Sequence, residues 1–431
     1  DEINSVKTLC MTEALCPYSS TRDDPMRLAM GFIQTQKHGM RCDHSDPLLI
    51  TSGADEALPH LISNTFAYKS KDAGEVIELT DDYMIIKYNR EIVDYTSGKK
   101  TQYEYINLKE EVQKNSSSGF YVTLKLDTDL KVGKKFKKGD IIAYDRESFS
   151  NNVGADDNIA YNIGTLAKFA ILNTDEGYED SAIVSDTLSE QMASDIVLEI
   201  EKTIPKEASV YDLVKKGQKI TEGDTLMILQ NSYDDEDVNV LLRNLSGDEN
   251  EVTDLGRIPI KSKVTGVVQD IIIERTVDIS ELSPSLKTIV KKYEGDINAR
   301  KKIMKKYGIE DENKTLPDTE TMPAIGRLKK AQDSVVIRIY LKYHDKFSVG
   351  CKLIYGTAVK GVCKDIFPKG LEPYSQYRPN EMIHSLLSIG SINARMVTSE
   401  LITAGINKGL IELSRKVKDM AGIKWKDNLI E

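Results

Sequence analysis

Short apolar runs separated by Gly, Asn and Asp dominate residues 60–145. Two of them are contained in AGEVIELTDDYMIIKYN and GFYVTLKLDTDLKVG. Apolar runs of this length, interrupted by turn-forming residues, are typical of consecutive β-strands. The pattern therefore predicts that this part of the chain is mostly β.

A short internal repeat supports the β prediction. The segments 132–143 (VGKKFKKGDIIA) and 215–227 (KKGQKITEGDTLM) each contain a Gly, five intervening residues, a Gly-Asp pair and an apolar run. The equivalent residues are Gly133, Gly139 and Asp140 in the first copy and Gly217, Gly223 and Asp224 in the second. Because glycine adopts positive φ and aspartate caps a turn with its side chain, each copy predicts two strands joined by a tight turn within a barrel.

Helices are predicted in two later segments. Residues 285–307 form a basic helical pattern, and residues 394–420 place Met396, Leu401, Ile402, Ile406 and Leu410 at spacings compatible with one helix face. The hydrophilic segments 231–254 and 308–323 bracket the basic helix and are typical of surface loops. We therefore expect residues 191–335 to form an exposed insertion.

A strand is predicted immediately after this insertion. In DSVVIRIYLKY, residues 333–343, apolar side chains alternate with a second set that includes Arg338 and Lys342. Alternation of this kind predicts a half-buried strand that leads into the segment 349–362.

Composition and charge narrow the class of protein. A chain of 431 residues with 40% hydrophobic content suggests two to four domains. Because the net charge is −10, any nucleic acid must be bound through a local basic surface. No apolar run approaches the roughly 20 residues needed to cross a bilayer, and no secretory leader is recognised, which predicts a soluble intracellular protein without a membrane partner. The five cysteines include no CxxC pair and are expected to be reduced thiols.

The segment VGCKLIYGTAVKGV, residues 349–362, contains two lysines among apolar and small residues and no acidic residue. Glycines allow the backbone to approach a ligand closely, and two ammonium groups without a carboxylate suit a polyanion such as a phosphodiester chain. Lys352 and Lys360 are therefore candidate phosphate-binding residues. The alternative is a pair of solvated lysines at strand edges, which is the common situation of lysine.

Three further residues are candidates for the same chemistry. Glu179 and Asp180 follow a glycine and precede a predicted strand, so they are either turn residues or carboxylates near Mg²⁺, which prefers one or two carboxylates plus phosphate oxygens. Arg395 begins a predicted helix and is either an exposed helix residue or a bidentate ligand of a triphosphate. The acidic run at 234–240 is interpreted as a solvated loop.

Several familiar catalytic motifs are absent from the sequence. It contains no GxxxxGK[ST], no GxGxxG after a strand, no HExxH and no GxSxG. Since these motifs carry the usual ATPase, dehydrogenase, metalloprotease and hydrolase sites, none of those activities is predicted. A self-contained enzyme is not expected.

The order of motifs along the chain resembles the β subunit of multisubunit DNA-directed RNA polymerases. The segments that carry the resemblance are, in order, STRDDPMRLAMGFIQTQ, DPLLITSGADEA, VGKKFKKGDIIA, GYEDSAIVS, SKVTGVVQDIII, VVIRIYLKY, VGCKLIYGTAVKGV and NARMVTSEL. The resemblance runs nearly end to end and covers the C-terminal part of β. It is most similar to the split β-like subunits of large tailed bacteriophages.

This resemblance implies a mixed α+β, β-rich fold in which a double-psi β-barrel carries an inserted flap-like domain and is followed by a helical C-terminal segment. The expected parts are a fork-like region at 1–47, the first part of the barrel at 48–190, the flap-like insertion at 191–335, the second part of the barrel at 336–400 and the helical segment at 401–431.

The resemblance also implies roles for the candidate residues. Lys352 and Lys360 match the lysine pair that contacts phosphates of the RNA 3′ end and the incoming nucleotide. Glu179 and Asp180 match an acidic pair near the second Mg²⁺, and Arg395 matches an arginine that contacts the nucleotide triphosphate. The aspartates that hold the catalytic Mg²⁺ belong to β′ in this family, so we expect the chain to be inactive alone.

The implied partners are an N-terminal β-like chain, β′-like chains, template DNA, product RNA, nucleoside triphosphates and a promoter-specificity factor. The implied location is the cytoplasm of an infected bacterial host, or the virion. Two alternatives from other classes are a non-catalytic barrel that binds nucleic acid or scaffolds a complex, and an interaction module whose flap-like insertion docks a partner.

The sequence departs from the family pattern at several positions. Cys351 replaces the usual Asp before the first lysine, and Gly356 and Thr357 occupy positions where Arg and His are common. Glu56 stands where a second triphosphate-binding arginine is expected, and Ile33 stands in place of Asn in the fork motif. These departures bear on individual contacts more than on the order of the motifs.

Overall fold

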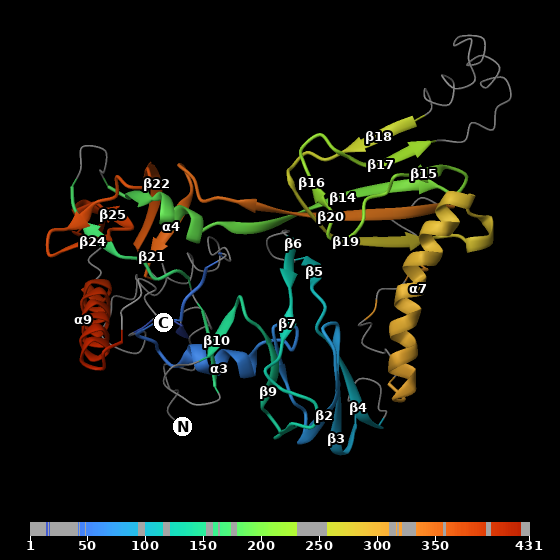
Figure 1. The fold of residues 1–431 in the computed structure, drawn as a ribbon, viewed down its shortest axis with the longest axis horizontal. Helices are drawn as coiled ribbons and strands as arrows, with labels where there is room; N and C mark the ends of the chain where they lie inside the picture. Colours follow the sequence, from blue (N-terminus) through green and yellow to red (C-terminus); the bar gives the residue numbers. More distant parts are fainter. Residues whose placement is uncertain are drawn as a thin grey trace, which may run out of the picture.

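The computed structural model is rich in β-strands with a few helices, and its strands include a sheet curled into a half-barrel (Figure 1). The described residues are 14–15, 17, 42, 44–47, 49–93, 100–114, 121–151, 158–162, 164–173, 179–230, 257–309, 316, 319–320, 333–356, 359–393 and 398–423, and the side chains of 392–393 and 398–400 are outside this description. The β-rich α+β class predicted from the sequence is confirmed. The finer prediction of a double-psi barrel with an inserted flap stays a prediction.

The first third of the chain forms two antiparallel sheets, with strand orders β4-β3-β2-β8 and β1-β9-β7. Their strands are β1 Ala67–Lys69, β2 Gly74–Leu79, β3 Tyr83–Val93, β4 Lys100–Asn107, β7 Leu126–Asp127, β8 Lys135–Phe136 and β9 Ile141–Asp145. Both faces of β3 are covered, since Met84 and Ile86 pack in one apolar cluster and Ile85 in another. The predicted β character of residues 60–145 is confirmed.

The two copies of the internal repeat have the same turn geometry, as predicted. Their four glycines have φ of 82°, 88°, 81° and 90°, in the region that favours glycine. In the first copy the Asp140 carboxylate accepts a hydrogen bond of 2.7 Å from the Lys137 amide, and in the second the Asp224 carboxylate accepts one of 2.8 Å from the Thr221 amide. A short strand precedes each turn and a longer one follows it, since β16 (Lys219–Ile220) and β17 (Thr225–Gln230) match β8 and β9.

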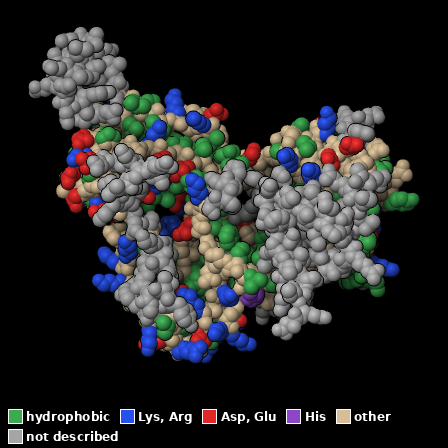
Figure 2. Space-filling view, turned by 180° about the vertical axis from the view of Figure 1, so that it is seen from behind, with side chains coloured by type: hydrophobic (Ala, Val, Ile, Leu, Met, Phe, Trp, Pro, Cys, Tyr) green, Lys and Arg blue, Asp and Glu red, His purple; other side chains and the backbone are tan. Residues whose placement is uncertain are grey.

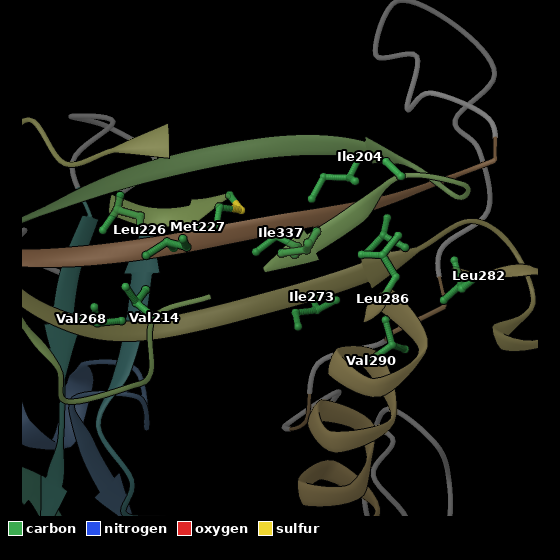
Figure 3. Close-up of a cluster of buried hydrophobic side chains, with 14 of the residues drawn as sticks. Ile204, Val214, Leu226, Met227, Val268, Ile273, Leu282, Leu286, Val290 and Ile337 are labelled. Carbon is green, nitrogen blue, oxygen red and sulfur yellow. The ribbon is translucent and has the colours of Figure 1, made fainter. Parts of the chain in front are cut away.

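A six-stranded sheet, β16-β19-β20-β14-β6-β5, forms the centre of the molecule. Its other strands are β5 Glu111–Lys114, β6 Tyr121–Leu124, β14 Ser194–Pro205, β19 Gly266–Arg275 and β20 Ser334–Asp345. β14 and β20 pair along their whole length, from Ser194 opposite Asp345 to Pro205 opposite Ser334. Figure 3 shows the apolar cluster on one face of this sheet. Ile204, Ile273 and Ile337 are members of the cluster that come from its strands.

The strand predicted after the insertion is β20, but it is more buried than its alternation suggests. Val335, Ile337, Ile339 and Leu341 are buried as expected. Val336 and Tyr340, on the other face, are also buried. The reason is that residues of other strands also cover this second face, as the ring of Tyr121 does at Tyr340, which a pattern within one strand does not reveal.

Helix α7, Pro284–Lys306, joins two parts of the molecule. It begins at the cap Ser283, and its first turns bury Leu286 and Val290 in the cluster of the central sheet. Its last turns bury Ile297 and Met304 against Ile85 and Tyr105 of the sheet β4-β3-β2-β8. The basic helix predicted at 285–307 is confirmed, and it shares a core cluster with strands that precede the predicted insertion.

A hydrogen bond supports the same contact. The Tyr307 hydroxyl, just after α7, donates to the Glu78 carboxylate of β2 over 2.5 Å, and the rings of Tyr103 and Tyr307 lie 5.5 Å apart. Two further small sheets are β15-β17-β18, whose strand β15 lies beside α7, and the pair β10-β11, which lies beside the helix Ala54–Leu61. Their remaining strands are β10 Phe149–Asn151, β11 Ile159–Tyr161, β15 Ser209–Tyr211 and β18 Arg257–Lys261.

The C-terminal part contains a five-stranded sheet, β12-β25-β13-β22-β21, a small hairpin β23-β24 and the last helices. The bounds are β12 Phe169–Ile171, β13 Ser181–Ser185, β21 Lys352–Tyr355, β22 Val359–Phe367, β23 Tyr374–Ser375, β24 Arg378–Met382, β25 Ser385–Leu387, α8 Ile389–Asn393 and α9 Thr398–Met420. Two other helices are α3 Ala54–Leu61 and α4 Asp186–Gln191. The predicted C-terminal helix is confirmed over Thr398–Met420, and the first four residues of the prediction, 394–397, lie outside the described residues.

The apolar positions predicted on one face of the C-terminal helix are exposed. Ile402 is 54% exposed, and Leu401, Ile406 and Leu410 are each at least 38% exposed. The remaining member of that set, Met396, lies outside the described residues, as do the predicted loop 231–254, most of 308–323 and most of the fork-like region 1–47. Among the helices in the described ranges, none is both long and apolar enough to cross a membrane.

Replacing Ile297 by Ala should lower the free energy of unfolding by about 2–4 kcal/mol, because the side chain is buried between α7 and the sheet β4-β3-β2-β8. Lys301→Ala is the matched control, since Lys301 is exposed one turn further along the helix and its loss should change stability by less than about 0.5 kcal/mol. Urea unfolding followed by circular dichroism measures both. Equal midpoints would show that α7 does not pack on this sheet.

Candidate functional site

The two lysines identified in the sequence lie on the antiparallel hairpin formed by β21 and β22. Lys352 is directly opposite Val362, and Ile354 is directly opposite Lys360. Because residues opposite each other in an antiparallel pair point to the same face, both lysines project from one face of the hairpin. They are diagonal neighbours, which places their Cβ atoms roughly 7–8 Å apart or slightly less.

The other face of the hairpin is apolar and buried. Leu353 and Cys363 pack with Ala182, Val184 and Leu188 of β13 and α4. Burial raises the pKa of the Cys363 thiol to about 11. This packing holds the backbone of the hairpin while the lysine side chains extend into solvent.

A buried hydroxyl contact anchors the end of β21. The Tyr355 hydroxyl is hydrogen-bonded to the Ser385 hydroxyl of β25, and Ser385 Oγ donates to the Ile183 carbonyl of β13 over 2.9 Å. Burial raises the pKa of Tyr355 to about 12. The hairpin is thereby tied to the two strands β13 and β25.

The acidic pair lies beside the lysine hairpin. Glu179 and Asp180 immediately precede β13, which pairs in parallel with β22 from Ser181 opposite Val362. The Val362 amide donates to the Asp180 carbonyl over 2.8 Å. The structure therefore brings together two of the predicted groups, although they are about 170 to 180 residues apart in the sequence.

The backbone at this junction has two further features, one at Gly361 and one at the acidic pair. A Cβ on Gly361 would lie 3.4 Å from the Asp180 carbonyl oxygen and 3.5 Å from the Ala182 Cβ, which are ordinary van der Waals distances, so an alanine here would fit against β13. Glu179 and Asp180 have φ of 29° and 31°, which non-glycine residues adopt rarely and at a cost of about 1–3 kcal/mol each. Backbone strain of this kind clusters at functional sites in proteins, which makes the acidic pair a candidate.

The start of α8 contributes to the same area. A Cβ on Gly390 would lie 3.9 Å from Cγ of Glu179, so this end of α8 is beside the acidic pair. Arg395 is five residues further along the chain but lies outside the described residues, between the end of α8 and the start of α9. Its proposed contact with a triphosphate stays a prediction.

A third lysine was missed by the sequence reasoning. Lys364 is exposed and continues the alternation of β22, in which Lys360 and Val362 are exposed and Gly361 and Cys363 are buried. The register of β22 against β13 shifts at this point, so Lys364 lies at a β-bulge. The spacing of two between exposed side chains in KGVCK is the signal that would have identified it.

The exposed face of the hairpin carries uncompensated positive charge. Lys352, Lys360 and Lys364 form neither a hydrogen bond nor an ion pair within the described part of the chain. The nearby Asp365 carboxylate accepts a hydrogen bond of 2.8 Å from the Ile366 amide. This face can bind phosphate groups through three ammonium groups, aided by the carboxylates of the adjacent acidic pair if a cation is present.

An apolar cavity of about 90 Å³ lies behind the hairpin. It is lined by Tyr355 and Val359 of the hairpin, Phe169 and Leu387 of the neighbouring strands, and residues of α9 such as Leu401. Its apolar lining does not suit an anion, so phosphate binding is expected on the lysine face alone. Among the described residues, no group of three or more His, Cys, Asp or Glu side chains is arranged to hold a metal ion.

Comparisons with known proteins add no family assignment. No model of a known protein family matches the chain, and no curated protein matches it significantly. The motifs of the sequence and the geometry of the hairpin and acidic pair are therefore the basis for a proposed function.

The raised pKa of Cys363 predicts slow alkylation of this thiol in the folded protein. The thiolate is the nucleophile, so at about pH 8 almost no reactive form exists, and the rate should rise about tenfold per pH unit up to about pH 11. Because the folded-state pKa lies above the ordinary 9.0, the associated stability is present below pH 9.0 and is lost as the pH rises through about 11.

Iodoacetamide labelling followed by peptide mass spectrometry measures the rate for Cys363 alone. The protein unfolded in urea is the control and should react at the rate of an ordinary thiol. Equal rates in folded and unfolded protein at about pH 8 would mean that the inner face of the hairpin is not buried.

Proposed function

We propose that this chain is a β-like subunit of a multisubunit DNA-directed RNA polymerase and corresponds to the C-terminal half of β. The observation that supports this most directly is the contact between the segments of Asp180 and Val362. The resemblance expects the acidic pair and the lysine pair at one active centre, and the two groups come from adjacent strands. The ordered motifs supply the remaining support.

In this proposal the lysine face of the hairpin binds the phosphates of the RNA 3′ end and of the incoming nucleotide. An ammonium group is a compact charge that stabilises the negative charge gained by the reacting phosphate. Lys352 and Lys360 carry the main effect, and Lys364 adds charge at the bulged end of the same strand. The buried inner face keeps these groups in position, which is the preorganisation that electrostatic catalysis requires.

In this proposal a Mg²⁺ ion binds near the acidic pair, and most of its ligands come from another chain. Glu179 and Asp180 are two carboxylates beside the proposed phosphate site, and Mg²⁺ is commonly held by one or two carboxylates together with phosphate oxygens and water. When bound, the ion neutralises charge on the phosphates during nucleotidyl transfer. The role of this chain is then to orient the ion's water ligands with Glu179 and Asp180 and to bind the phosphates with its lysines.

The remaining parts of the proposal follow from the family resemblance. The strands around the site would form a double-psi barrel that carries a flap-like insertion, and Arg395 would bind the nucleotide triphosphate. An N-terminal β-like chain and β′-like chains would complete the active centre on template DNA and product RNA, with a promoter-specificity factor added for initiation. The enzyme would act in the cytoplasm of an infected bacterial host, or travel in the virion.

A second candidate is a non-catalytic barrel that binds nucleic acid or scaffolds a complex. It is favoured by Cys351, which occupies the position of the usual Asp and whose thiol lies 3.5 Å from the Ser348 hydroxyl. A cysteine at this position supplies no carboxylate to pair with Lys352. Under this alternative the lysine face would bind phosphates without contributing to a reaction.

Replacing both Lys352 and Lys360 by Ala should nearly abolish nucleotide addition. Each ammonium group is expected to contribute about 2–4 kcal/mol to the transition state, which is about 30-fold to 1000-fold in rate. Single variants should be intermediate and less than additive because the lysines are neighbours. Lys364→Ala should reduce the rate by about tenfold or less, since it lies at the end of the site.

The measurement is single-nucleotide extension on a DNA–RNA scaffold, using the native complex isolated through a tag on this chain. Both side chains are exposed, so folding and assembly should be preserved, and size exclusion checks this. A double variant that assembles and extends within about threefold of wild type would remove the active-centre proposal in favour of the non-catalytic barrel.

Arg395→Ala should raise the apparent KM for nucleotide more than it weakens binding of the DNA–RNA scaffold. A guanidinium that binds a triphosphate acts on the substrate and not on the template. Because Glu56 replaces the second expected arginine, Arg395 should contribute a larger share of triphosphate binding. Steady-state extension by the same complex gives KM, Arg395→Lys tests the need for a bidentate group, and an unchanged KM would show that Arg395 does not contact the nucleotide.

A further inference from the structure

Helix α7 carries a concentration of positive charge. Between Pro284 and Lys306 it contains eight basic residues and two acidic ones, a net charge of +6, whereas the whole chain has a net charge of −10. The helix lies at the opposite end of the molecule from the hairpin β21–β22 (Figure 1). Its charge therefore has no part in the site described above.

The basic residues gather on the side of α7 that faces solvent. The α7 lysine face consists of five exposed residues, Lys291, Lys292, Lys301, Lys302 and Lys305. Figure 2 shows blue side chains along the edge of the molecule where this helix lies. The buried residues, such as Ile297 and Met304, point toward the sheet instead.

Three of these lysines lie along one line on the surface of the helix. At about 100° per residue, Lys291, Lys302 and Lys305 lie within about 60° of one another, and the other two lysines flank them. At about 1.5 Å per residue the line from Lys291 to Lys305 is about 21 Å long. A rigid row of positive charges of this length can contact several negative charges of an extended polyanion.

No carboxylate of the described chain neutralises the α7 lysine face. Its five ammonium groups form neither hydrogen bonds nor ion pairs with other described residues. The neighbouring Lys306 is 3.6 Å from the Glu78 carboxylate, and the Glu294 carboxylate is 2.9 Å from Arg275. Other positive groups of the chain are paired, such as Arg338 with Glu199 and Glu201.

We propose that the α7 lysine face binds the phosphodiester backbone of a nucleic acid, independently of base sequence. Lysine contacts to phosphates release counterions and supply affinity without reading bases. The aromatic residues of this region do not offer stacking surfaces, because Tyr293 and Tyr307 are half-buried and the Tyr307 hydroxyl is hydrogen-bonded to Glu78. This binding does not depend on the function proposed for the hairpin.

The test is binding of the full chain to fluorescent oligonucleotides of about 20 nucleotides, measured by anisotropy between about 50 and 200 mM salt. Lys291, Lys302 and Lys305 are replaced together by Gln, which keeps helix propensity. We expect binding to weaken by about tenfold or more at the lowest salt, and the slope of log affinity against log salt to fall by about 2–3.

The matched control is a variant in which three lysines outside α7 are replaced, so that the same positive charge is removed from another surface. Lys131, Lys134 and Lys135 are exposed lysines of the turn before β8 and of its first residue, on an edge strand of the sheet β4-β3-β2-β8, and their joint replacement by Gln should leave binding unchanged. Single-stranded RNA, single-stranded DNA and duplex DNA form the arms. Equal losses in all arms support a shared phosphodiester contact, and a loss confined to one arm identifies that backbone.

Three outcomes would overturn the proposal: absence of binding by the wild-type chain at low salt, unchanged binding by the α7 variant, and equal weakening by the control variant. Circular dichroism verifies that the triple variant retains its helix. If it does not fold, Lys302→Gln alone replaces it, and the salt slope should then fall by about one.

Discussion

The candidate site depends on the position of β22 between β13 and β21. One hydrogen bond, from the Val362 amide to the Asp180 carbonyl, lies where the acidic and lysine segments meet. The neighbouring Gly361 is buried at this contact. Without the parallel pairing of these strands, the two charged groups would have no reason to share a site.

The inner face of the hairpin determines which residues its outer face exposes. Leu353 and Cys363 are buried against β13 and α4, and in a strand the next residue necessarily points the other way. A register slip of one residue would bury Lys352 and expose Leu353, which is strongly unfavourable. The lysines are therefore held on the exposed face by apolar packing, and their charge is free to act on a ligand.

The same separation of faces occurs in α7, at the other end of the molecule. Ile297 and Met304 bury one side of the helix against β3 and β4, and this leaves the lysines on the other side. This contact also links the predicted insertion, residues 191–335, to the sheet β4-β3-β2-β8, which comes earlier in the chain. The insertion and the first sheet thus share a core cluster, and a deletion that removes α7 would expose Ile85 and Tyr105.

Local patterns determined the strands, the helices and the repeated turns, because glycine conformation, aspartate caps and side-chain periodicity act over a few residues. The alternation in β22 even contained the signal for Lys364. Only the tertiary structure decided that Val336 is buried, that Ile402 is exposed and that Asp180 meets Val362. The physical reason is that a pattern shows which side of an element is apolar, whereas its partner is selected by packing between segments far apart in the chain.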